Sequence, residues 1–112
     1  METKFLDLTR LLEVADGDTE FVTQVLTEYA HTVPELLTEL QTAIDHEDLL
    51  GVQSRAHDLK GTSQTVGAYA LAEGARAVEM AARDEDWDAI RSLRRNLEAT
   101  WNETQQEVSN AA

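Results

Sequence analysis

Hydrophobic residues recur at intervals of three and four positions along almost the whole chain, with polar residues between them. This spacing is typical of amphipathic helices, each with one apolar face. Only five glycines and one proline interrupt the 112 residues, and no segment alternates apolar and polar residues as a strand does. The pattern predicts helical segments over about 7–14, 19–44, 49–66, 69–83 and 87–108.

Polar clusters rich in aspartate separate these segments and supply their ends. Asp18 and Asp48 stand where an N-cap is needed, and Gly67 suits the position that follows a helix C-terminus. Pro34 is expected to end or kink the second segment, but the apolar stripe resumes beyond it, which predicts a bent, spatially continuous helix. Short connections favour antiparallel neighbours. We therefore predict an all-α fold, an antiparallel up-and-down four-helix bundle with an additional short N-terminal helix.

Composition narrows both the kind of domain and the kind of partner. A chain of 112 residues fits a single domain, which we assign to residues 1–112 with its core at about 8–107. The formal net charge of −13 disfavours nucleic acid and anionic membranes as partners, because both are bound by clustered lysine and arginine. No apolar run approaches about 20 residues, the N-terminus lacks a signal-peptide pattern, and cysteine is absent. We expect a cytoplasmic monomer that does not bind membranes.

The predicted helix over 49–66 carries an unusual group of residues on the face that points away from the core. Positions spaced by three and four fall there within one narrow arc, namely His57, Lys60, Gly61 and Gln64. An exposed imidazole is a nucleophile near neutral pH, and a nearby ammonium group can offset negative charge placed on the ring. Glycine inside a helix costs about 1 kcal/mol relative to alanine, so Gly61 indicates a need for space beside the ring.

Each of these residues also has an ordinary interpretation. A solvent-facing histidine is usually only solvated, a neighbouring lysine is usually a surface charge, and a helical glycine can serve close helix packing. Their combination is less ordinary, and the segment reads His57-x-Leu59-Lys60-Gly61-x-Ser63, followed by Gly67-Ala68. This signature resembles that of histidine-containing phosphotransfer (HPt) domains, and the resemblance extends over about 8–107. In that family the histidine carries a phosphoryl group between the aspartates of receiver domains.

The resemblance implies a role for each residue of the arc. His57 would accept a phosphoryl group through Nε2 from an aspartyl phosphate or a kinase, and would pass it to the aspartate of a response regulator. Lys60 would offset the phosphate charge, while Gly61 and Gln64 would form the surface on which the partner docks. The implied partners are response-regulator receiver domains and a sensor or hybrid histidine kinase.

A second candidate position lies on the helix that follows. Measured from Leu71, Glu79 falls about 80° round the helix, at the rim of the apolar face, where its carboxylate would accept a hydrogen bond from Nδ1–H of His57. Alternatively, Glu79 and Arg83 form an i,i+4 surface pair worth only a few tenths of a kcal/mol. The resemblance favours the contact with His57, since Leu71 followed by Val78-Glu79 is similar to the family's pattern, and we expect Arg83 to assist the phosphate.

The sequence lacks the motifs with which a chain would phosphorylate itself. It contains no Gly-rich phosphate loop, no dinucleotide fingerprint and no βα pattern for an acidic Mg²⁺ pocket. Glu28-x-x-His31 is half of a carboxylate-bundle metal motif, but no second copy exists, so we predict no metal site and no cofactor of its own. We therefore predict a carrier and not an enzyme, with Mg²⁺ supplied in the partner receiver domain.

One alternative from a different class stays open. The same fold would serve as a non-phosphorylated interaction module that binds a receiver or kinase domain through the face around His57. Lys60 and Gly61 beside that histidine favour the phosphorelay interpretation, because a module that only binds its partner has little need of all three residues together.

Overall fold

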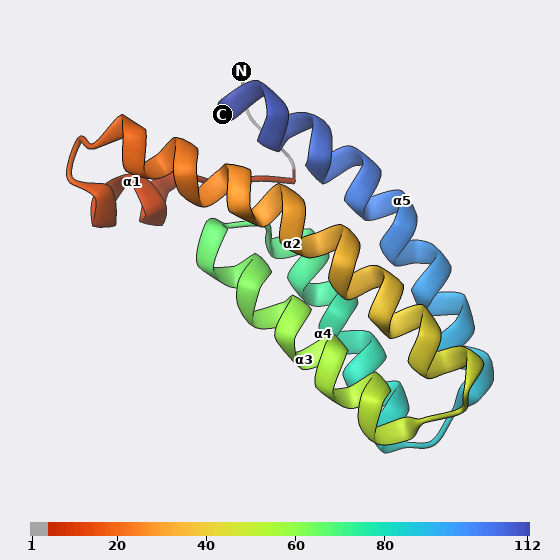
Figure 1. The fold of residues 1–112 in the computed structure, drawn as a ribbon. Coiled ribbons are helices and arrows are strands. Elements are labelled where there is room, and N and C mark those ends of the chain that lie inside the picture. The colour runs from red at the N-terminus through yellow and green to blue at the C-terminus, as the bar shows by residue number, and fades with distance from the viewer. Residues whose placement is uncertain (1–4) are drawn as a thin grey trace.

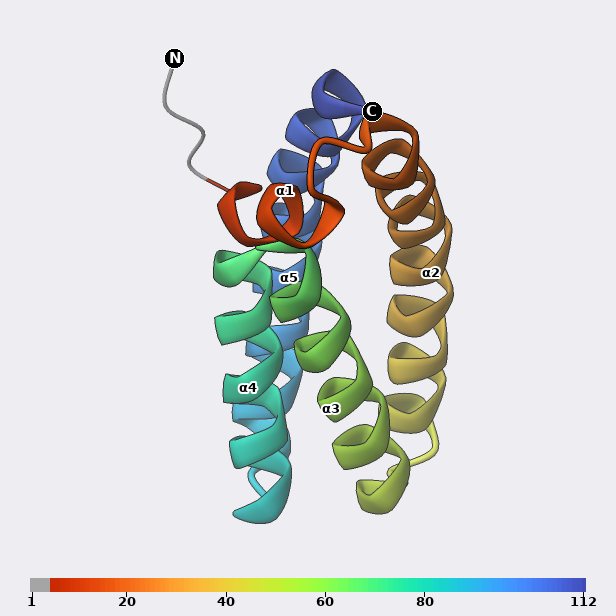
Figure 2. The ribbon, with the colours of Figure 1, turned by 90° about the vertical axis from the view of Figure 1, so that its left-hand side faces the viewer.

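Four longer helices lie side by side in alternating directions, and a shorter helix crosses one end of them, in the computed structural model, which describes residues 5–112 (Figure 1, Figure 2). In chain order the helices are α1 Thr9–Ala15, α2 Thr19–Asp45, α3 Leu49–Val66, α4 Tyr69–Arg83 and α5 Trp87–Ala111. Residues 5–112 contain no strand. The predicted all-α, antiparallel four-helix bundle with an additional N-terminal helix is therefore confirmed. Within those same residues, no helix combines the length and apolar character that crossing a membrane requires.

Aspartate side chains begin three of the bundle helices. Oδ1 of Asp18, Asp48 and Asp86 each accepts a hydrogen bond from the backbone N–H three residues further on, at 3.0 or 3.1 Å. These bonds satisfy N–H groups that have no partner inside the helix. The chain leaves α2 and α4 through Glu47 and Glu85, which adopt left-handed backbone conformations with φ of 51° and 54°. Short connections of this kind set the helices antiparallel.

Two helix ends differ from the sequence prediction, and one interior residue behaves as predicted. The first helix begins only at Thr9, because Asp7 is drawn out of it by a hydrogen bond from its N–H to the Gly67 carbonyl at 2.9 Å. The last helix continues to Ala111, three residues beyond the predicted end, since neither glycine nor proline interrupts it there. Pro34 lies inside α2 without ending it, which agrees with the predicted continuous helix.

The core fills the space between the four longer helices. Its largest fully buried apolar side chains are Leu26, Leu40, Leu59, Leu71, Ile90 and Leu97. α4 contributes mainly small residues to this core, and a Cβ at Gly74 would come within 2.8 Å of Leu97 Cδ2. Small residues let helix backbones approach closely, so α4 lies tightly between α3 and α5. This close packing fixes α4 relative to the outer face of α3.

One polar pair lies inside this core, behind the face of α3 that carries His57, Lys60, Gly61 and Gln64. The hydroxyl groups of Tyr29 and Ser63 are 2.7 Å apart, and the Tyr29 ring meets Trp101 edge to face with 5.8 Å between the centroids. Burial raises the pKa of Tyr29, so the phenol stays neutral. This hydrogen bond joins α2 to α3. Ser63 of the signature therefore has a structural role in the core.

The segment before α1 packs across the turn between α3 and α4. Leu6 is buried, and the backbone N–H of Phe5 donates to Glu107 Oε2 in α5 at 2.9 Å. Gly67 ends α3 with a φ of 82°, as predicted for the C-terminus of that helix, and a Cβ there would overlap the carbonyl oxygen of Asp7. The turn therefore needs glycine for its backbone conformation and also for the close approach of this segment.

Gly67→Ala is expected to lower the free energy of unfolding by more than the roughly 1–2 kcal/mol that a left-handed backbone costs a residue with a Cβ. The excess arises because the methyl group also displaces Asp7. Gly17→Ala is the matched control, since Gly17 has a φ of 86° but open space around it. Urea unfolding of both variants measures the difference. Equal losses would show that the segment is not held against Gly67.

Candidate functional site

α3 presents His57 on the outside of the bundle, while neighbouring residues on its inner side anchor the helix. Ala56 and Leu59 are fully buried, whereas the His57 side chain is 65% exposed. The step of about 100° between adjacent helix positions produces this contrast. The imidazole is therefore open to another molecule while the backbone that carries it is fixed.

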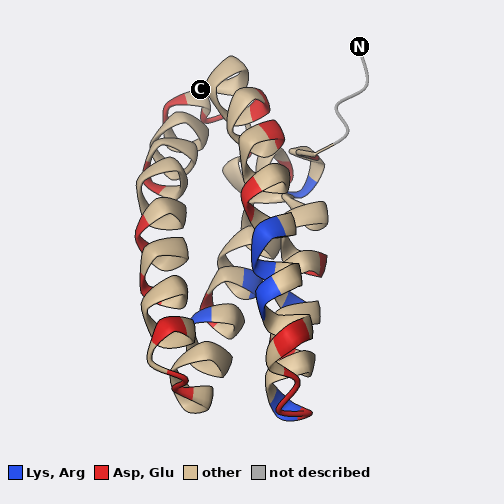
Figure 3. Cartoon of the chain, turned by 90° about the vertical axis from the view of Figure 1, so that its right-hand side faces the viewer, with Lys and Arg blue, Asp and Glu red and all other residues tan. Residues whose placement is uncertain are grey.

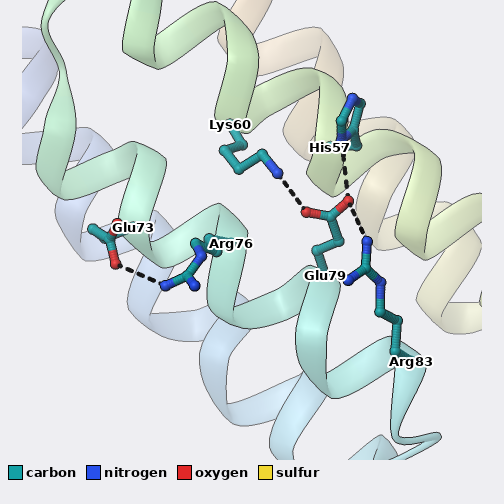
Figure 4. Close-up of polar contacts among 6 residues, drawn as sticks. All are labelled: His57, Lys60, Glu73, Arg76, Glu79 and Arg83. Atoms are coloured by element: carbon teal, nitrogen blue, oxygen red, sulfur yellow. Dashed lines mark hydrogen bonds and ion pairs between the residues drawn. The ribbon is translucent and has the colours of Figure 1, made fainter.

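Glu79 lies beside His57 and is almost entirely buried, although it is charged. It projects from α4 toward α3, and only 6% of the residue is exposed (Figure 4). Its Oε2 is 3.1 Å from Nδ1 of His57, and its Oε1 accepts a hydrogen bond from Lys60 Nζ at 2.8 Å. Arg83 Nη2 lies 3.7 Å from Oε2. One buried carboxylate therefore gathers three basic side chains from two helices.

The charge of this carboxylate is maintained by its neighbours. The hydrogen bond from Lys60 is the largest influence and lowers the pKa of Glu79, with a further lowering from His57, while burial acts in the opposite direction. The net shift is downward, so Glu79 is ionised at neutral pH. An ionised carboxylate only accepts hydrogen bonds, so Nδ1 of His57 carries the proton, and in the neutral ring Nε2 keeps its lone pair. Figure 4 shows the ring with one nitrogen directed at Glu79 and the other directed away from it.

The lowered pKa of Glu79 predicts how stability depends on pH. Below its ordinary pKa of 4.5, the unfolded chain takes up a proton at Glu79 more readily than the folded chain does. The stabilisation is therefore complete above that value and is lost as the pH falls through the lower pKa of the folded state. We expect Glu79→Gln to unfold more easily than the native chain at neutral pH, and the difference to shrink in acid. Urea unfolding from about pH 7 to about pH 3 measures both curves; parallel curves would contradict the account.

The structure places the predicted site residues as follows. Glu79 makes the contact with His57 that its position on the helix predicts, and it also makes the i,i+4 pair with Arg83 that was the alternative, so the two interpretations are compatible. Gly61 has open space where a Cβ would stand, so packing within the chain does not explain the glycine. Gln64 is exposed further along the same side of α3.

Lys60 turns toward Glu79 in the structure, and its role toward a phosphoryl group on His57 stays a prediction. Its side chain is 23% exposed and its ammonium group is bound to Oε1 of Glu79. The contact between Lys60 and Glu79 could have been predicted from the positions round the helix, because Lys60 stands about 60° before His57, on the side toward α4. The sequence alone does not say how deeply the partner carboxylate is buried, which is what fixes the lysine.

The two other histidines lie away from this group. His31 is exposed on α2, and Nδ1 of His46 lies 2.8 Å from the carbonyl oxygen of Thr42. Within the described residues 5–112, no three histidine or carboxylate side chains come together as a metal site would require.

Sequence and fold both place this chain among known proteins. Residues 24–103 match the family model for the Hpt domain. Over 91 residues, 81% of this chain, it is 29% identical to the phosphorelay intermediate protein rdeA of Dictyostelium discoideum, of whose length it covers 36%. The fold matches the crystal structure of histidine-containing phosphotransfer protein B (HptB) from Pseudomonas aeruginosa PAO1 with a TM-score of 0.88 and 24% identity, covering 97% of this chain and 95% of that one. The chain belongs to the Hpt domain family.

Proposed function

We propose that this chain is a phosphorelay intermediate, in which His57 accepts a phosphoryl group and passes it to an aspartate of a response-regulator receiver domain. The observation that carries the proposal is the pairing of an exposed imidazole with a buried carboxylate. The His57 side chain is 65% exposed, and Glu79 holds its Nδ1 at 3.1 Å. This arrangement leaves Nε2 as the nucleophile that faces outward.

The acceptance step uses the lone pair of Nε2. Nε2 attacks the phosphorus of an aspartyl phosphate on the partner, the N–P bond forms, and the P–O bond to the aspartate breaks with its electron pair on the leaving carboxylate. The proton on Nδ1 stays in place, so the phosphorylated ring carries positive charge. The ionised Glu79 carboxylate stabilises that charge through the hydrogen bond from Nδ1. Glu79 thus orients the ring and offsets its charge without touching the phosphorus.

The donating step is the reverse with a different partner. A carboxylate oxygen of the second receiver attacks the phosphorus, and the P–N bond breaks with its electron pair on Nε2, which restores the neutral ring. We propose that Lys60 and Arg83 offset the negative charge of the phosphoryl group during both steps. Arg83 is 65% exposed and bound to Glu79 only at 3.7 Å, so it can turn outward, whereas Lys60 acts from its place beside Glu79.

The partner surface would meet α3 beside the imidazole. Gly61 and Gln64 follow His57 along the exposed side of the helix, and the space above Gly61 allows a partner backbone to approach Nε2. We propose receiver domains and a sensor or hybrid histidine kinase as partners, with the catalytic Mg²⁺ in the receiver. In this proposal the chain is a cytoplasmic, monomeric carrier without a nucleotide site of its own.

The family and two similar proteins support this role. The protein from Pseudomonas aeruginosa whose fold matches is named a histidine-containing phosphotransfer protein, and the Dictyostelium relative is named a phosphorelay intermediate. The present chain spans only 36% of that relative's length. The role is therefore proposed for the domain and its histidine.

A panel of phosphorylated receiver domains tests the proposal. Each receiver is labelled on its aspartate and mixed with the native chain, and the label on the chain is followed with time. We expect at least one receiver to transfer acid-labile, base-stable label, the behaviour of a phosphohistidine. Saturable binding to a receiver without any transfer would contradict the proposal and favour the interaction module.

A further inference from the structure

Charge is distributed very unevenly between the helices. Residues 49–83, which form α3 and α4, carry four basic and three acidic side chains, whereas the rest of the chain carries five basic and nineteen acidic ones. α2 alone has five acidic residues and no basic residue, and Figure 3 shows acidic positions along its length. In a protein with a net charge of −13, the segment that carries His57 is therefore slightly positive.

The acidic side chains of this region are all held by basic partners. Asp58 pairs with Arg55 at 3.3 Å, and Glu79 is surrounded as described. Glu73 lies 3.8 Å from Arg76, a loose pair in which both side chains are more than half exposed. On the solvent side of α4, Arg76 and Arg83 flank Glu79, and their side chains are 56% and 65% exposed (Figure 4). Two arginines thus stand free enough to meet a partner beside the imidazole.

α5 has a second basic group, but its setting differs. Arg91, Arg94 and Arg95 lie in the N-terminal half of α5, where Arg94 is bound to Glu98 at 2.9 Å and Arg91 approaches Glu47 at 3.7 Å. Acidic residues outnumber basic ones on this helix, four to three. Within the described residues, α5 packs against α2 and α4 and not against α3. This group therefore does not extend the positive region around His57.

We infer that the partner surface that docks over α3 and α4 is acidic, and that the charge separation across the bundle orients the partner as it approaches. Long-range attraction to the face of His57, with repulsion from the acidic faces, raises the rate of productive encounter, by 10-fold or more where such steering is strong. The inference rests on the proposed phosphorelay function. It further specifies that the partner's docking surface is acidic and that Arg76 takes part in docking. We assign Arg76 to partner docking, because it is exposed beside the site and its own contact is weak.

Charge reversal at two matched positions tests this inference. Arg76→Glu and Arg95→Glu lower the net charge equally, and both residues are exposed on a helix, but only Arg76 lies on the face of His57. With the receiver that transfers label to the native chain, we expect Arg76→Glu to lower the second-order rate of transfer about tenfold at low salt, and Arg95→Glu to leave it within about twofold. The rate of transfer at saturating receiver should be the same for Arg76→Glu as for the native chain, because Arg76 does not contact the ring. The second-order rate of Arg76→Gln should lie between those of the native chain and Arg76→Glu.

Ionic strength supplies the second readout. The native rate should fall as salt is added, and the rate of Arg76→Glu should fall less. Equal effects of the two reversals, or a native rate that does not depend on salt, would overturn the inference while transfer to His57 and the proposed function stand. Absence of transfer from every receiver to the native chain would overturn the proposed function, and the inference with it.

Discussion

His57→Gln is expected to abolish acceptance of the phosphoryl group and to leave the fold nearly unchanged. Glutamine has no nucleophilic nitrogen, so no N–P bond can form, and the loss should be complete within detection. The effect on stability should be small, within about 0.5 kcal/mol, because the side chain is exposed and the substitution removes little packing. Label transfer and thermal unfolding of the same preparation measure both quantities.

The chain offers matched controls for this prediction. His31→Gln and His46→Gln make the same chemical change at exposed positions on α2 and after it, away from Glu79. Both variants should accept label at the native rate. Label that persists in His57→Gln and disappears from one of the others would place the phosphoryl group elsewhere. A large loss of stability in His57→Gln would show that the ring packs into the fold.

Substitutions at Gly61 should move stability and transfer in opposite directions. Gly61→Ala should raise the free energy of unfolding by about 1 kcal/mol, because alanine favours the helix and its Cβ meets nothing within 4 Å. The same methyl group reduces the space beside His57, so transfer should slow. Gly61→Gln should slow it about 100-fold or more, since a displacement of about 1 Å at the reacting atoms costs that much.

A glutamine placed elsewhere on an exposed helix face separates the two effects. Ala99→Gln adds the same side chain on α5 and should leave the transfer rate unchanged. Native transfer by Gly61→Gln would mean that the partner does not approach α3 at this position. A loss of stability in Gly61→Ala would mean that the glycine serves helix packing after all, the ordinary interpretation of a helical glycine.

Local sequence signals account for most of the fold. The three-and-four spacing defines each helix, the aspartates at 18 and 48 cap the helices as predicted, and Gly67 ends α3 in the left-handed conformation. Such signals are local, because a cap or a turn depends on a few neighbouring residues. The start of α1 could not be predicted in this way, since it depends on the hydrogen bond between Asp7 and Gly67, which are distant in sequence.

In the candidate site, too, some features follow from local sequence signals and others depend on how the helices pack. The exposed position of His57 and the rim position of Glu79 follow from counting residues along each helix. The bond between Lys60 and Glu79 depends on how closely α3 and α4 approach, and the sequence does not fix that distance. The burial of Glu79 could not be predicted either, because charged residues are rarely buried unless they are paired. The uneven charge of the helices could be counted from the sequence, but the bundle is what gathers it onto one face.

The site of phosphorylation within the ring of His57 tests the central claim most directly. Because Glu79 occupies Nδ1, the account predicts that the phosphoryl group resides on Nε2. Phosphorus–nitrogen correlation NMR of the phosphorylated chain, with labelled histidine, distinguishes the two nitrogens. A single phosphohistidine bonded through Nε2 of His57, absent from His57→Gln, is the predicted result. A phosphoryl group on Nδ1, or on another residue, would contradict the role assigned to the pair of His57 and Glu79.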